Sequence, residues 1–146
     1  MFVSRFSSII LIISLCFVSM PECSAASAIS LAKQALEVTS GFDRPLIGGN
    51  IEKAQELYTE YKAIYDKLHK FLQEPPKNTW GSELGCVRRA GSIVNMRRIV
   101  LMDYIIMIDA LQRNQNEEYN SIRSKLYRDW RSVNEWRRIF YRKYGF

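Results

Sequence analysis

Few side chains in this sequence are of the types and at the spacings that catalysis requires. The chain has one histidine, His69, and three cysteines, of which only Cys86 lies beyond the first 28 residues. A zinc site needs several ligands at short fixed spacings, and neither residue has such companions nearby. We also find no glycine-rich phosphate loop, nucleophile elbow or paired-cysteine motif. The sequence therefore predicts a protein that is not an enzyme and holds no cofactor or metal.

Cys86 is the residue with the clearest nucleophilic interpretation. It falls near the start of an expected helix and close to Arg88 and Arg89, where the helix dipole and the positive charges would favour a thiolate. A cysteine hydrolase would need His69 as its base, and no family signature surrounds the cysteine. A buried small residue, or a disulfide between two chains that would make a homodimer, is therefore the favoured interpretation.

A small haem or redox carrier is an alternative function. In a helical bundle, His69 and one of three methionines could bind an iron from both sides. The methionines in question are Met96, Met102 and Met107. Methionines at helical spacing more often fill a core, so this alternative ranks last.

Asp103 lies in the most apolar stretch of the chain, where an unpaired carboxylate would be costly. We expect an arginine from another helix, or a tyrosine hydroxyl, to neutralise it. Asp109 follows six residues later and so points in a different direction on a helix. The two carboxylates are therefore not expected to form a catalytic pair.

Arginines concentrated in the carboxyl-terminal half are the strongest candidates for binding. Residues 80–146 contain 13 basic and seven acidic side chains, whereas residues 27–79 are balanced, so the formal net charge of +6 arises in the second half. Guanidinium groups pair with carboxylates and phosphates, and neighbouring aromatic rings add stiff apolar contact. A basic solvent face over an aromatic core stripe would give the same pattern. The predicted partner-binding residues are Arg123, Arg128, Arg131, Arg137, Arg138 and Arg142.

Four segments have the spacing of helices. They cover about residues 27–39, 51–72, 82–114 and 119–144, with Asn50 and Ser82 as expected caps and Pro75 and Pro76 ending the second segment. The second segment carries a heptad seam from Ile51 to Leu72, which could serve the internal core or a dimer. The sequence predicts an all-α fold: a small antiparallel bundle of three long helices and one short leading helix.

The third segment is expected to be the central helix. Residues 99–111 are apolar on nearly every side, and only Asp103 and Asp109 interrupt them. Four arginines precede this stretch and are expected to keep the first half of the helix in contact with water. They are Arg88, Arg89, Arg97 and Arg98. In the last segment, Trp130 and Trp136 belong to the apolar repeat that is expected to face the core.

Residues 1–26 are expected to be a signal peptide. Arg5 precedes a short apolar run from Ile9 to Val18, and small residues follow, which is the order that export machinery reads. The run is about half the roughly 20 residues of a membrane span. Cleavage is expected after Ala25, Ala26 or Ala28. This would leave one helical domain, residues 27–146, with no transmembrane segment.

These observations predict an exported binding protein, periplasmic or secreted. Cys86 alone would survive processing and no N-glycosylation acceptor occurs, so a bacterial origin is favoured. The expected role is that of an inhibitor, immunity or secretion-accessory protein that engages an acidic partner through its last helix. In general architecture it resembles small helical immunity and accessory proteins of the periplasm. The alternative is a binder of anionic membrane or envelope polymer; export argues against nucleic acid.

Overall fold

Four helices make up the part of the chain that the computed structural model describes, residues 26–40 and 50–145. They are α2 (Ala26–Val38), α3 (Ile51–Gln73), α4 (Gly81–Gln112) and α5 (Asn116–Tyr144). No strand occurs within those two ranges. The predicted all-α helical bundle, with one short helix and three long ones, is confirmed.

The helix boundaries follow local capping chemistry. The side chain of Asn50 accepts a hydrogen bond from the Lys53 N–H at 3.0 Å, so this residue caps α3 as predicted. In contrast, α4 begins at Gly81, before the predicted cap Ser82. The carboxylate of Glu83 reaches back and accepts from the Trp80 N–H at 2.7 Å. The cap of α4 therefore depends on an acidic residue inside the helix and not on the serine.

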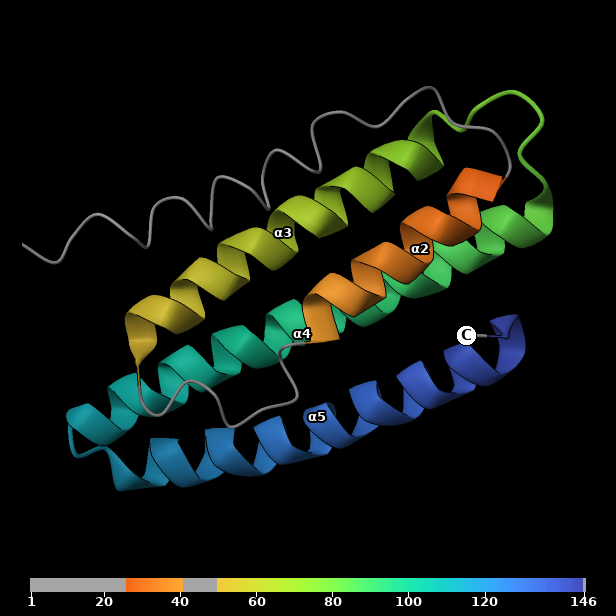
Figure 1. Cartoon of the computed structure of the whole chain (residues 1–146). Helices are drawn as coiled ribbons and strands as arrows, with labels where there is room; N and C mark the ends of the chain where they lie inside the picture. Colours follow the sequence, from red (N-terminus) through yellow and green to blue (C-terminus); the bar gives the residue numbers. More distant parts are fainter. Residues whose placement is uncertain (1–25, 41–49, 146) are drawn as a thin grey trace, which may run out of the picture.

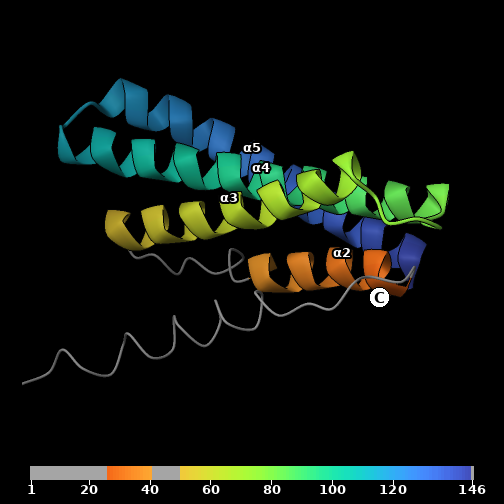
Figure 2. The ribbon, with the colours of Figure 1, turned by 90° about the horizontal axis from the view of Figure 1, so that it is seen from above.

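The central position predicted for α4 is confirmed, because α4 packs against each of the other three helices. Successive helices alternate in direction, so α3 and α5 run antiparallel to α4 while α2 runs parallel to it (Figure 1). Figure 2 shows α5 crossing the α3–α4 pair, from the side away from α2 at its start to the side of α2 at its carboxyl-terminal end. The close approach of α2 to α4 rests on three fully buried alanines. They are Ala28, Ala32 and Ala35.

The heptad seam of α3 serves the internal core. Ala54, Tyr61 and Leu68, seven residues apart, are all buried, and Leu68 lies beside Gly91 of α4. A β-carbon added at Gly91 would lie 3.9 Å from the Leu68 β-carbon, which is ordinary van der Waals contact, so α3 and α4 pack closely at this level.

The second half of α4 is less enclosed than its sequence predicts. The carboxyl-terminal end of α2 reaches only Arg97, midway along α4, so beyond that point α4 packs mainly between α3 and α5. Met102, Ile106 and Leu111 are consequently more than a third exposed. The central position of α4 therefore does not extend to complete coverage of residues 99–111.

Arg97 corrects a second expectation, because it is fully buried and not in contact with water. Its Nη1 donates to the Leu36 carbonyl oxygen at 2.9 Å and to the Thr39 hydroxyl. These acceptors lie at the end of α2, where carbonyl groups lack partners within the helix and the dipole favours a cation. The hydroxyl of Tyr61 donates to the Thr39 carbonyl oxygen at 3.0 Å. Arg97 thus acts as a buried cap for α2.

Candidate partner-binding surface

The helix that carries the six predicted binding arginines, α5, is stabilised at both ends by charge. Glu117 and Glu118 lie in its first turn, and Arg142 and Lys143 lie in its last turn, which suits the helix dipole. Gly145 ends the helix with a φ of 72°, a left-handed conformation that favours glycine. This arrangement explains why α5 continues almost to the end of the chain.

A narrow apolar stripe attaches α5 to α4. Val133 and Phe140, seven residues apart, are the buried residues of α5, and Leu126 and Tyr144 extend the stripe while partly buried. Because α4 is its principal packing partner, most of the circumference of α5 faces solvent.

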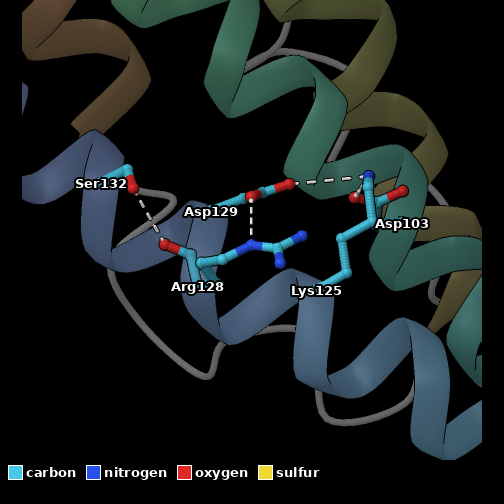
Figure 3. A network of polar contacts seen from close by, with 5 residues as sticks. All are labelled: Asp103, Lys125, Arg128, Asp129 and Ser132. Atoms are coloured by element: carbon cyan, nitrogen blue, oxygen red, sulfur yellow. Dashed lines mark hydrogen bonds and ion pairs between the residues drawn. The ribbon is translucent and has the colours of Figure 1, made fainter.

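A polar cross-link supplements this stripe, as Figure 3 shows. Lys125 of α5 forms a salt bridge with Asp103 of α4 and lies 3.5 Å from Asp129. The hydrogen bond from Lys125 to Asp103 raises the pKa of the lysine, and burial opposes this only in part. The Nε atom of Arg128 lies 3.6 Å from Asp129. Asp103 is thus neutralised from another helix as predicted, but by lysine and not by arginine or tyrosine.

Asp109 pairs separately with Arg113 at 2.6 Å, so the two acids form no catalytic pair.

The structure places the six predicted binding arginines in four environments. Arg131, Arg138 and Arg142 are exposed and spaced seven and four residues apart, which puts them in one row on the outer face of α5. Arg138 lies 3.6 Å from Glu135 within the same helix. We call Arg131, Arg138 and Arg142 the arginine row.

The other three predicted arginines lie outside this row. The exposed Arg128 makes the contact with Asp129 described above. Arg123 is positioned over the ring of Tyr127, with its Cζ 5.8 Å from the ring centroid. Arg137 is partly buried, towards the packed side of the helix. The arginine row is therefore the part of the predicted set that is best placed to meet a partner.

Trp130 and Trp136 flank the buried stripe of Val133 and Phe140 on opposite sides of α5, contrary to the expectation that they belong to the core. Trp130 is 36% exposed and Trp136 is 42% exposed. They are six residues apart, which corresponds to about 240° around a helix, so both cannot lie in one buried stripe. Tyr127 and Ile139 are also exposed. Periodicity detected the apolar repeat of α5, but it could not show that these large rings flank the stripe.

Cys86 does not have the environment of a nucleophile. It is fully buried in the core, and burial raises the pKa of its thiol to about 11. The desolvation of Cys86 therefore outweighs the expected effect of the helix dipole and of Arg88 and Arg89. Because the sulfur is enclosed, the alternative of a disulfide between two chains is also wrong for this fold, and Cys86 is a buried small residue.

His69 lies on the exposed side of α3 and stacks on Tyr65, with 5.9 Å between the ring centroids. Met96 packs against the core. Within residues 26–40 and 50–145, no three histidine, cysteine, aspartate or glutamate side chains are grouped so that they could hold a metal ion. Nor is any helix of these ranges both long and apolar enough to cross a membrane.

Comparisons of the chain with protein-family models, curated proteins and solved structures found no match. The features of the structure that bear on function are therefore the arginine row, the exposed Tyr127 on the same face and the packing of α5 on α4.

Proposed function

We propose that this protein is an exported, non-enzymatic binding protein of the cell envelope, and that it engages an acidic protein through the outer face of α5. The proposed role is that of an inhibitor, immunity or secretion-accessory protein. The single observation that carries the proposal is the arginine row with the exposed Tyr127 on the same face of α5.

The composition of this face is that of a protein interface. Tryptophan, tyrosine and arginine are the residues enriched at positions that dominate binding free energy. When a partner covers a partly exposed ring, apolar surface is removed from water, and this makes the free energy of binding more favourable. The guanidinium groups can pair with the carboxylates of that partner in a planar, two-point geometry.

The scaffold holds the face in place before a partner binds. Val133 and Phe140 fix one side of α5 to α4, and the salt bridge between Lys125 and Asp103 ties the same two helices together. A surface that is already ordered loses less conformational freedom on binding.

The packing of α5 disfavours the alternative in which this helix lies in a membrane surface. An amphipathic helix binds membranes by burying its apolar face among the lipids. In α5, the apolar stripe of Val133 and Phe140 is already buried in the protein. An anionic polymer would pair with the arginines but leave the exposed rings without a clear role.

Export is the remaining part of the proposal, and it rests on the leader. Arg5, the apolar run from Ile9 to Val18 and the alanines after it form the pattern of a cleaved signal peptide. The partner is therefore sought in the envelope.

The test is a pull-down from envelope extract with charge-reversed proteins. The Arg131→Glu/Arg138→Glu protein should lose an acidic protein that the unaltered protein retains in high salt. The matched control is Lys53→Glu/Lys70→Glu, which reverses two exposed charges on α3. It should retain the partner, and circular dichroism should show the same helix content in all three proteins. Equal capture by both variants would contradict the proposal.

A further inference from the structure

Charge is distributed unevenly along the long axis of the bundle. The start of α4 and the finish of α5 lie at the same end of the bundle. This is shown by Gly85 and Tyr144, since a β-carbon built on Gly85 would lie 4.0 Å from the Tyr144 hydroxyl. The same end holds the start of α2 and the finish of α3 (Figure 1). We call it the leader end, because the residues that precede α2 join the bundle there. The opposite end is the far end.

The leader end is strongly basic. We divide the bundle into two halves at Arg97 and Arg98, in the middle of α4. Gly91 of α4 lies beside Leu68 of α3, and Asp103 of α4 pairs with Lys125 of α5. These two contacts show where the same dividing plane crosses α3 and α5. On this division, the leader half comprises residues 26–40, 62–98 and 131–145, with 14 basic and five acidic side chains and a formal net charge of +9. The far half comprises residues 50–61 and 99–130, with five basic and eight acidic side chains and a net charge of −3.

An exposed tryptophan occupies the leader end. Trp80 is 72% exposed, the highest value among the exposed large apolar residues. Its loop is held by the Thr79 hydroxyl, which donates to the Pro76 carbonyl oxygen at 2.7 Å, and by the bond from the Trp80 N–H to Glu83. The hydrogen-bonded loop therefore presents the indole to solvent, and the same loop carries the exposed Lys77.

We propose that the leader end rests on an anionic phospholipid surface, with Trp80 at the level of the headgroups. Tryptophan favours the interface between membrane and water, and lysine and arginine near that interface are attracted to anionic lipids. Lys77 in the loop and Lys143 in the last turn of α5 supply cations at this end.

The position of the leader supports the same occupant. Its apolar run, Ile9 to Val18, precedes α2 in the chain, and α2 begins at the leader end. If the protein is exported as proposed above, the leader is still attached to α2 at the membrane just before it is cleaved. The leader end is then the end of the bundle that reaches the membrane. The acidic far end then points away, and the arginine row lies along the side of the bundle, where a protein partner can reach it.

Vesicle binding with single-tryptophan proteins tests this inference directly. The chain has three tryptophans, so Trp130→Phe/Trp136→Phe leaves Trp80 and Trp80→Phe/Trp136→Phe leaves Trp130. With purified protein and vesicles of mixed phosphatidylglycerol and phosphatidylcholine, the Trp80 emission should shift to the blue and brominated lipid should quench it. Trp130 should show neither change, and vesicles of phosphatidylcholine alone should have no effect. A response from Trp130, or from neither tryptophan, would overturn the inference.

Charge removal supplies the matched comparison. Lys77→Ala/Lys143→Ala should weaken partitioning onto phosphatidylglycerol vesicles about five-fold for each charge removed. Lys53→Ala/Arg123→Ala removes two exposed cations from the far half and should change partitioning less than about two-fold. Equal losses in the two proteins would show attraction without orientation and would contradict the inference. A protein that ignores vesicles but loses its captured partner on Arg131→Glu/Arg138→Glu would contradict this inference alone.

Discussion

At the scale of single residues, Arg97 shows how one side chain can decide the position of a helix. Arg97 and Arg98 are adjacent residues of the same type, and the sequence predicts that both side chains are exposed to solvent. The structure buries Arg97 against the end of α2, whereas Arg98 lies over the rings of Tyr58 and Tyr65. No periodicity in α4 alone predicts this difference, because it depends on where another helix ends.

Removing the buried guanidinium should destabilise the protein much more than removing its neighbour. Arg97→Ala deletes charged hydrogen bonds to the Leu36 carbonyl and the Thr39 hydroxyl, and we expect a loss of about 3 kcal/mol in the free energy of unfolding. Arg98→Ala should cost about 1 kcal/mol. Urea denaturation measures both values. Similar losses in the two proteins would mean that Arg97 does not cap α2.

The thiol of Cys86 predicts a specific dependence of stability on pH. Its pKa rises from 9.0 to about 11 on folding, because burial disfavours the thiolate. The part of the folding stability that depends on a protonated thiol is fully present below pH 9. It decreases as the pH rises from about 9 to about 11, because the unfolded chain loses the proton at a lower pH than the folded chain does. We expect Cys86→Ala to have a smaller decrease over this interval, by at most about 2 kcal/mol. Unfolding of both proteins at several pH values checks this, and parallel curves would contradict it.

At the scale of elements, the sequence predicted the four helices because their signals are local. Helical spacing, the Asn50 cap and the Pro75–Pro76 break each act within a few residues. The start of α4 was displaced because Glu83 replaced Ser82 in capping. The roles of Trp130 and Trp136 could not be predicted, because spacing shows that residues are apolar but not which face of the helix a neighbour covers.

The two kinds of aromatic residue on α5 should differ in their effect on stability. Phe140 is 2% exposed, and Phe140→Ala should cost about 3 to 4 kcal/mol through lost burial and a cavity. Trp136 is 42% exposed, and Trp136→Ala should cost about 1 kcal/mol or less. Urea denaturation of the two variants makes the comparison. An equal loss for Trp136→Ala would show that this tryptophan belongs to the core after all.

At the scale of the whole molecule, the sequence located the excess of positive charge in its second half, and the structure relocates it to one end. The difference arises because α3 folds back along α4, so that Lys67, Lys70 and Lys77 join the arginines of α4 and α5 at the leader end. The chain order of charges cannot reveal this polarity until the directions of the helices are known. The arginine row was part of the predicted set, but its separation from Arg123, Arg128 and Arg137 also required the packed side of α5 to be identified.

The claim that the outer face of α5 meets an acidic protein is tested most directly by crosslinking in intact cells. A photoreactive phenylalanine analogue placed at Tyr127, which is 55% exposed and lies on the same face of α5 as the arginine row, should give one discrete adduct with an acidic envelope protein. The same analogue at Leu111, which is 47% exposed near the end of α4, provides the control and should give no such adduct. No adduct at position 127, or the same adduct at both positions, would contradict the proposed function.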